Sequence, residues 1–242
     1  MSALPKIALA EDAGVLAPAA ADGIDGEAAP AATDGATVAE SLGTTAAAKR
    51  KRPKPGERRL QILQTLAAML EQPGAERITT AALAAKLDVS EAALYRHFAS
   101  KAQMFEGLIE FIESSVFTLV NQLVEREPQP AAQARKIAAV ILQFGEKNPG
   151  MTRVMVGDAL VFEHERLNAR MNQFFDRVES QLRGSLRAAA EAGGSSTPTV
   201  DAQAIASALV ALIVGRLQRY ARSGFKRQPT EHLEPALARL AP

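Results

Sequence analysis

The sequence predicts an all-α fold. Long stretches rich in Ala, Leu, Arg, Glu and Gln dominate the chain, and aromatic residues make up only 5% of it. Those residue types favour helices, whereas strands are enriched in aromatic and β-branched residues. Apolar residues recur at helical spacing, and Pro- and Gly-containing breakers separate the segments. The expected helices cover, in order, about residues 57–72, 80–87, 91–98, 100–127, 131–147, 152–157, 163–192 and 201–222, with a short one after 230.

Residues 78–98, ITTAALAAKLDVSEAALYRHF, carry the most specific pattern in the chain. Two short apolar-periodic segments flank Asp88-Val89-Ser90, which is the arrangement of a helix-turn-helix whose second helix enters a DNA major groove. The turn requires a left-handed backbone, and we expect Asp88 to adopt it because Asp tolerates that region better than most residues. Ser90 is expected to cap the second helix, and Ser100 with Gln103 to form a capping box on the next one.

The polar and exposed positions of this motif are the predicted DNA contacts. They are Thr79, Thr80, Ser90, Glu91, Ala92, Tyr95, Arg96, His97 and Lys101. Hydroxyls and free amides at a helix N-terminus bind phosphate, and the start of the recognition helix approaches base edges. Taken singly, Tyr95 could be a packing residue, His97 a structural histidine and Arg96 a solvated charge. Their clustering within three residues of the motif favours DNA contact.

The charge distribution divides the N-terminal part of the chain. Residues 1–48 form an acidic, Ala-rich tail with seven carboxylates against Lys6 alone, and we expect it to be disordered. Residues 49–59 then hold seven cations against Glu57, although the net charge of the chain is only +1. We interpret 49–55 as a basic arm. It either adds affinity for DNA, as minor-groove arms do, or serves only as a solubilising linker.

Enzymatic, metal-binding and membrane-spanning functions find no support in the sequence. The chain has no cysteine, and its three histidines lack metal-ligand spacing. It also contains no Gly-rich phosphate loop and no nucleophile motif, so we expect no catalysis and no cofactor. The longest apolar run, residues 204–214, is shorter than the roughly 20 residues that a bilayer span needs. We expect a cytoplasmic protein with no membrane span.

The motif and the segments after it resemble known proteins. SEAALYRHFASKAQMF is similar to the end of a TetR-type DNA-binding domain, which accounts for residues 56–105. The resemblance to the SlmA family of nucleoid occlusion factors continues to about residue 240. It rests on ITTAALAA, MFEGLIEFIE, FGEKNPGMTRV, ALVFEHERLNARMNQFFDRVESQLR and RSGFKRQPT. A generic TetR repressor is expected to match only the first fifty or so residues of that stretch.

The resemblance implies a TetR-like protein with two partners. Members of that family bind chromosomal DNA as homodimers and bind FtsZ, whose polymers they antagonise over the nucleoid. The region 106–242 is then a helical FtsZ-interaction and dimerisation domain. The positions that match the FtsZ-facing surface are Phe111, Lys147 and Asn148. Phe111 is also compatible with a plain core residue, and Lys147-Asn148 with a plain helix terminus. Leu119 stands where the family tends to have Arg, Ala99 where Pro is common, and Asp88 where Gly is common.

Two further expectations concern the C-terminal region. The apolar stripes of helices 163–192 and 204–220 suit a four-helix dimer interface, which would present two recognition helices to a pseudo-palindromic DNA site. Either stripe is also compatible with intramolecular core. The alternative function is a TetR-type transcriptional repressor that a small molecule releases. Its pocket would be lined by Met151, Met155, Phe162, Met171 and Phe174, unless these are only core residues.

Overall fold

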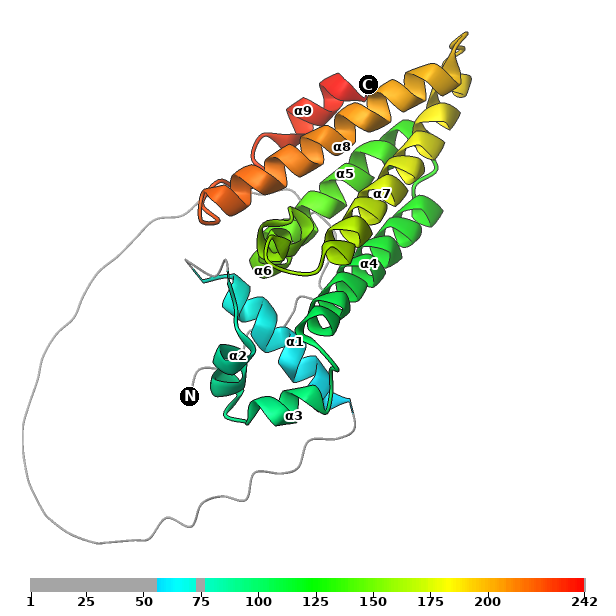
Figure 1. Cartoon of the computed structure of the whole chain (residues 1–242). Coiled ribbons are helices and arrows are strands. Elements are labelled where there is room, and N and C mark those ends of the chain that lie inside the picture. The colour runs from blue at the N-terminus through cyan, green and yellow to red at the C-terminus, as the bar shows by residue number, and fades with distance from the viewer. Residues whose placement is uncertain (1–55, 73–76, 242) are drawn as a thin grey trace, which may run out of the picture.

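The computed structural model describes residues 56–72 and 77–241, and all regular elements in these ranges are helical (Figure 1). The tail 1–48 and the arm 49–55 lie outside the described residues. The helices are α1 Glu57–Leu70, α2 Thr80–Leu87, α3 Glu91–Tyr95, α4 Lys101–Arg126, α5 Pro130–Lys147, α6 Pro149–Met155, α7 Glu165–Ala192, α8 Pro198–Arg222 and α9 Leu233–Leu240, with a 3-10 turn η2 at Asp158–Leu160. The all-α prediction is confirmed.

The helices form two connected groups. α1, α2 and α3 cluster at one end of the molecule, and α4 leads from that cluster into a bundle with α5, α7 and α8 (Figure 1). α7 and α8 pack along each other more extensively than any other pair of helices, and α5 lies against both. α6 contacts α1 and also α8, so the two groups meet at α6 as well as through α4.

The turn between α2 and α3 has the predicted geometry. Asp88 adopts a left-handed backbone with φ 55° and ψ 51°, and its N–H donates to Ala85 O. Thr79 and Ser90 cap α2 and α3 by accepting the N–H groups of Ala82 and Ala93. These caps satisfy amides that each helix start would otherwise leave without a partner.

The recognition helix is shorter than predicted. α3 ends at Tyr95 rather than Phe98, and the N–H groups of His97 and Phe98 both donate to Leu94 O in a closing turn. The turn directs Phe98 into the core, where it is 1% exposed, and lets Ser100 begin α4. Ser100 accepts from Gln103 N as expected, but the Gln103 side chain accepts from Ala99 N, one residue before the position of a standard capping box.

The breaker Asn148-Pro149-Gly150 both ends one helix and begins the next. Pro149 occupies the first turn of α6, where its missing N–H costs nothing, so α6 starts three residues earlier than predicted. Gly150 is required for packing, because a Cβ there would lie 2.2 Å from the carbonyl oxygen of Ala67 in α1. This close approach joins the bundle to the N-terminal helices.

The apolar core runs through both groups of helices. The predicted stripe of α7 is buried from Leu167 to Leu186, whereas Ala189 is half-buried. On α4, Val116 and Val120 are fully buried, whereas Leu119 and Leu123 are half-buried. α4 packs on α1 at its start and on α5 and α7 further along, so its buried face changes along its length.

By length and composition alone, α4 and α8 pass a test for helices that could cross a membrane. Core helices of a packed bundle pass the same test, and both helices contact several neighbours in the fold. α4 also carries Glu106 and Glu113, which form ion pairs with Arg166 and Arg170 of α7. We therefore interpret α4 and α8 as bundle helices.

Candidate nucleic-acid interface

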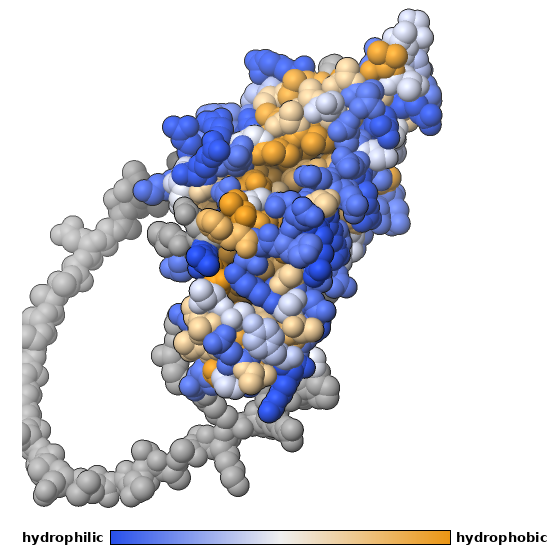
Figure 2. Space-filling model, viewed as in Figure 1, coloured by the Kyte–Doolittle hydropathy of each residue, from blue (hydrophilic) through white to orange (hydrophobic). Residues whose placement is uncertain are grey.

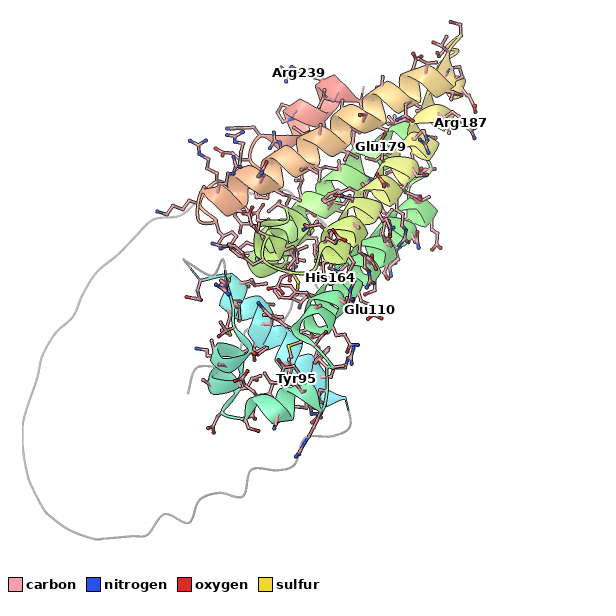
Figure 3. The ribbon with its side chains drawn as sticks, in the orientation of Figure 1. Tyr95, Glu110, His164, Glu179, Arg187 and Arg239 are labelled. Atoms are coloured by element: carbon pink, nitrogen blue, oxygen red, sulfur yellow. The ribbon has the colours of Figure 1, made fainter. Side chains whose placement is uncertain are left out.

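The predicted DNA-contacting residues lie on the segment that runs from the N-cap of α2 through α3 to the first residue of α4. Seven of the nine are exposed, and Thr80 and Lys101 are half-buried. Tyr95 is 46% exposed although it is a large aromatic residue, and Figure 3 places it on α3, far from α8 and α9. An exposed aromatic beside exposed Arg96 and His97 offers a phenol, a guanidinium and an imidazole to a ligand.

The helix caps leave hydroxyl protons available on this face. Thr79 Oγ1 accepts from Ala82 N at 3.1 Å, and Ser90 Oγ accepts from Ala93 N at 3.3 Å. A hydroxyl that accepts a cap hydrogen bond still carries its own O–H donor. Both side chains can therefore donate to a phosphate oxygen without breaking the cap.

Thr80 and Glu91 contact each other across the motif. The Thr80 hydroxyl donates to Glu91 Oε2 at 2.6 Å, which ties the first turn of α2 to the first turn of α3. The carboxylate of Glu91 is thereby held at the start of the recognition helix. Spacing alone did not predict this pair, because the two residues are eleven positions apart and on different helices.

Arg59 is a functional candidate that the motif does not include. Its guanidinium lies over the Phe98 ring, with 4.2 Å between Cζ and the ring centroid, and its NH1 donates to His97 O at 3.1 Å. The contact joins α1 to the end of the recognition helix and places a cation beside His97. The signal in the sequence is the basic run 49–59, of which Arg58 and Arg59 lie in the described part.

Lys101 makes a contact with the C-terminal bundle. Its ammonium pairs with Glu163, 62 residues away, and lies 5.7 Å from the Phe105 ring centroid. The side chain of Glu163 is 9% exposed and that of Lys101 is 26% exposed. Lys101 therefore links the start of α4 to the segment before α7, in addition to its predicted contact with phosphate.

Two further ion pairs continue this line along α4 and α7. Arg166 Nε donates to Glu106 Oε1 at 2.8 Å, and Arg170 binds Glu113 through both Nε and NH2. The hydrogen bond with Glu113 raises the pKa of Arg170 above its ordinary value, and desolvation opposes that shift only in part. We call these three ion pairs, Lys101–Glu163, Arg166–Glu106 and Arg170–Glu113, the ion-pair ladder. It fixes the register of α4, which begins at the DNA-binding end, against α7.

The residues matched to the FtsZ-facing surface lie on α4 and at the end of α5. Phe111 is half-buried, with its ring centroid 6.4 Å from that of Phe144. Lys147 is exposed. Asn148 is 6% exposed, and its Nδ2 donates to Phe144 O at 2.9 Å. Phe111 and Asn148 thus both contact Phe144. The exposed Lys147 precedes Asn148 in the chain and adds a positive charge there.

Buried polar groups surround the α5–α6 junction. Desolvation raises the pKa of Glu71, and a hydrogen bond from the backbone of Gly150 opposes this rise only in part. Tyr220 donates its hydroxyl to Glu146 O at 3.1 Å. Burial, together with the charges of Glu146 and Glu71, raises its pKa.

The five residues proposed to line a ligand pocket do not share a cavity wall. Met151, Met155, Met171 and Phe174 are at most 3% exposed and belong to the packed core, whereas Phe162 is 65% exposed. Phe162 contacts the guanidinium of Arg77, with 5.9 Å between Cζ and the ring centroid. In the described part of the chain, His, Asp and Glu also form no group of three or more that could hold a metal ion.

Comparison with known proteins identifies the class of protein that has this fold and this motif. A family model described as "Bacterial regulatory proteins, tetR family" matches residues 62–108, and one described as "Tetracyclin repressor-like, C-terminal domain", of the SlmA-like type, matches residues 129–240. A TetR-like regulator from Rhodococcus sp. RHA1 has 22% identity and a TM-score of 0.61, covering 78% of this chain and 97% of its own. The fold and the motif define a helix-turn-helix protein of the TetR type.

Closer relatives identify the family within that class. The nucleoid occlusion factor SlmA of Photobacterium profundum is 51% identical over 182 residues, which are 75% of this chain and 92% of the relative. The SlmA of Vibrio vulnificus is 50% identical over 189 residues, covering 78% and 96%. The chain belongs to the family of SlmA nucleoid occlusion factors. Both relatives are named as nucleoid occlusion factors.

Proposed function

We propose that this protein binds specific chromosomal DNA as a homodimer and, in the DNA-bound state, antagonises the assembly of FtsZ polymers over the nucleoid. The observation that carries the proposal is the identity of about 50% to SlmA factors across both halves of the fold. A protein that shared only DNA binding with them would match mainly over the helix-turn-helix domain. The proposed place of action is the cytoplasm, on the nucleoid.

On the DNA side, the proposal assigns two kinds of contact. Ser90, Glu91 and Ala92 at the start of α3 approach base edges, as the N-terminal residues of recognition helices do. The remaining predicted residues set the register through phosphate oxygens. They are Thr79, Thr80, Tyr95, Arg96, His97 and Lys101. The free hydroxyl proton of Thr79 is available to a phosphate oxygen, and that of Ser90 is available to a base edge or to a phosphate.

The homodimer is proposed to form through α7 and α8. Along the outer side of α8, Ala204, Ala208 and Ala211 are exposed, and a Cβ on Gly215 would meet no atom within 4 Å. Small side chains on one helix face let a second helix approach closely, and half-buried Ile205 and Leu212 flank this face. Figure 2 shows apolar atoms gathered in a band over α8, between polar surfaces.

On the FtsZ side, the proposal uses the surface between α4 and α5. The exposed edge of Phe111 and the ammonium of Lys147 would contact FtsZ directly. Asn148 would contribute by fixing the α5–α6 junction, since its amide is already bonded to Phe144 O. On α4, Phe111 lies ten residues beyond Lys101, and the other residues proposed for DNA and for FtsZ lie on or beside different helices. This separation supports simultaneous binding of both partners.

Sedimentation of FtsZ polymers tests the proposal. Purified FtsZ with GTP is pelleted alone, with the full-length protein, and with the protein plus a duplex selected for specific binding. We expect the polymer fraction to fall most in the last case. A Phe111→Ala variant should lose this effect while binding the duplex as before, and Tyr95→Ala should lose the stimulation by DNA. An undiminished polymer fraction in all conditions would favour the repressor alternative.

A further inference from the structure

The C-terminal end of α8 and the segment after it line a cavity of about 470 Å³ that is open to solvent on one side and that no role described above uses. A volume of this size lies within the range of small-molecule sites. Its lining residues are mostly cationic or polar, and they are Arg216, Arg219, Arg227, Gln228, Pro229, Glu231 and His232. Figure 2 shows strongly polar surface around this end of α8.

The charges of the lining are unbalanced. Three guanidinium groups face one carboxylate, that of Glu231, which is also 3.7 Å from His232 Nε2. Among the described contacts, the guanidinium groups of Arg219 and Arg227 have no hydrogen-bond or ion-pair partner. Like charges that converge on one cavity repel each other and create a positive potential, which an anion relieves.

The segment that carries Arg227 is held in place by several contacts. Arg216 NH1 donates to the carbonyl oxygens of Pro229 at 2.9 Å and Glu231 at 2.7 Å. Thr230 donates to the carboxylate of Glu146 in α5. The backbone of this segment and the side chain of Arg216 are therefore held in place, which lowers part of the entropic cost of binding a ligand.

Phe225 anchors the same segment from the other side. It has a left-handed backbone with φ 63°, an unusual conformation for an aromatic residue. Its ring packs on Tyr220 with 5.2 Å between centroids, and the guanidinium of Arg153 lies 5.4 Å from that ring. The packing of Phe225 holds the chain in this conformation, two residues before Arg227.

The alternative explanation for these cations is stabilisation of the helix end. Arg219 and Arg222 lie in the last turn of α8, where positive charge suits the helix dipole. This explanation does not extend to Arg227, which lies five residues beyond the helix. The carbonyl groups at the end of α8 are also already bonded to the N–H groups of Ser223, Gly224 and Phe225.

We propose that this cavity, the Arg216–His232 cavity, binds a small anion with adjacent phosphate groups, such as the polyphosphate part of a nucleotide. Planar guanidinium forks match phosphate oxygens, and several of them on one site suit a multiply charged group. Pro229 is the only apolar residue of the lining, so an apolar peptide side chain or an acyl chain would find little surface to bury. The site is distinct from the helix-turn-helix face and from the α4–α5 surface.

Calorimetric titration of the full-length protein with sodium tripolyphosphate tests this proposal. We expect saturable binding of one tripolyphosphate per chain, and a weakening of about tenfold in Arg219→Gln and in Arg227→Gln, because each loses one charge-assisted hydrogen-bonding group. Arg187→Gln is the matched control. Arg187 lies on α7 toward the opposite end of the α7–α8 pair (Figure 3). Its substitution removes the same charge as the two cavity variants.

The outcomes separate the sources of phosphate. Tighter binding of GTP or ATP than of tripolyphosphate would support a nucleotide as ligand, and equal binding would support the phosphates alone. No saturable heat up to about 1 mM tripolyphosphate would overturn the proposal. An equal loss in Arg187→Gln would also overturn it, since net charge would then explain the effect. So would weakened binding of duplex DNA by the two cavity variants without any binding of tripolyphosphate, because the arginines would then contact the DNA backbone.

Discussion

The side chains of the proposed DNA face differ in whether their hydrogen-bond donors are free or already bound within the chain. Thr79 and Ser90 accept cap hydrogen bonds and retain a free O–H donor. The Thr80 hydroxyl already donates to Glu91, and Lys101 is paired with Glu163. A phosphate that binds Lys101 must therefore compete with a carboxylate of the same chain. This competition links the DNA-binding end to the segment before α7.

Replacing Lys101 with Gln should weaken binding to specific and unrelated duplexes by similar factors. The slope of log K against log salt concentration should decrease by about 0.9, the value for one phosphate contact. Fluorescence anisotropy at several salt concentrations measures both quantities. Glu163→Gln is the paired variant, and it should leave the slope unchanged and bind DNA at least as tightly, since Lys101 is then released. A weaker complex with Glu163→Gln would show that the pair positions the lysine for DNA.

The raised pKa of Glu71 predicts a pH-dependent effect on stability. Desolvation disfavours the charged carboxylate in the folded state, so the folded pKa lies above the ordinary value of 4.5. The resulting destabilisation is absent well below pH 4.5, where both states are protonated, and is fully developed above the raised pKa. Glu71→Gln should therefore raise Tm at pH 7 and leave it nearly unchanged at pH 4. Melting curves by circular dichroism test this, and an equal gain at both pH values would contradict it.

Among the elements, the contact between α1 and α6 connects the DNA-binding end to the bundle. It depends on Gly150, which lets α6 approach the carbonyl oxygen of Ala67. The sequence showed Asn148-Pro149-Gly150 only as a breaker, because a helix stop and a helix start with Pro in its first turn produce the same local signal. The requirement for Gly comes from α1, some eighty residues earlier in the chain.

Substituting Gly150 with Ala should destabilise the fold by about 1–3 kcal/mol, the usual cost of overpacking. The added methyl group would collide with backbone atoms of α1, which cannot move aside as a flexible side chain can. Gly184→Ala in α7 is the matched control, because its Cβ would meet nothing within 4 Å. The control should be neutral or gain up to ~1 kcal/mol of helix stability. Urea unfolding of both variants measures the difference, and equal stabilities would refute a close α1–α6 contact.

At the scale of the whole molecule, the proposed homodimer must hold two DNA-binding ends in a fixed arrangement. A single recognition helix reads only a few base pairs, so specific binding requires two of them in a fixed arrangement. The ion-pair ladder between α4 and α7 fixes each DNA-binding end against the helix pair through which we propose that the dimer forms. The small-residue side of α8 is exposed within one chain.

A charged side chain on this side of α8 should separate the dimer. Ala211→Arg places a guanidinium where a second copy of α8 would pack, while the exposed position should tolerate it within one chain. Sedimentation velocity should show a monomer with an unchanged helical content, and affinity for a two-half-site duplex should fall about 100-fold or more as the second contact is lost. Arg239→Ala on α9 is the control. A dimer that survives Ala211→Arg would place the interface elsewhere.

The predictable features of this protein are those with a local cause. The left-handed Asp88, the caps at Ser90 and Ser100 and the stripe of α7 follow from neighbouring residues, and the structure contains them. The end of α3 was misplaced because the burial of Phe98 decides it, and that burial depends on packing with distant helices. The contacts of Arg59 with Phe98 and of Lys101 with Glu163 were missed for the same reason.

The sequence by itself determined the order of the helices, the helix-turn-helix and the family, although not every helix boundary. Helical periodicity, capping residues and turn residues act within a few positions of one another. Only the tertiary structure decided which charges pair across the two groups of helices, how deeply Asn148 lies at the α5–α6 junction, and that arginines of α8 and of the following segment share one cavity. These features join residues that are far apart in the chain. Their energies depend on burial and distance, which periodicity does not specify.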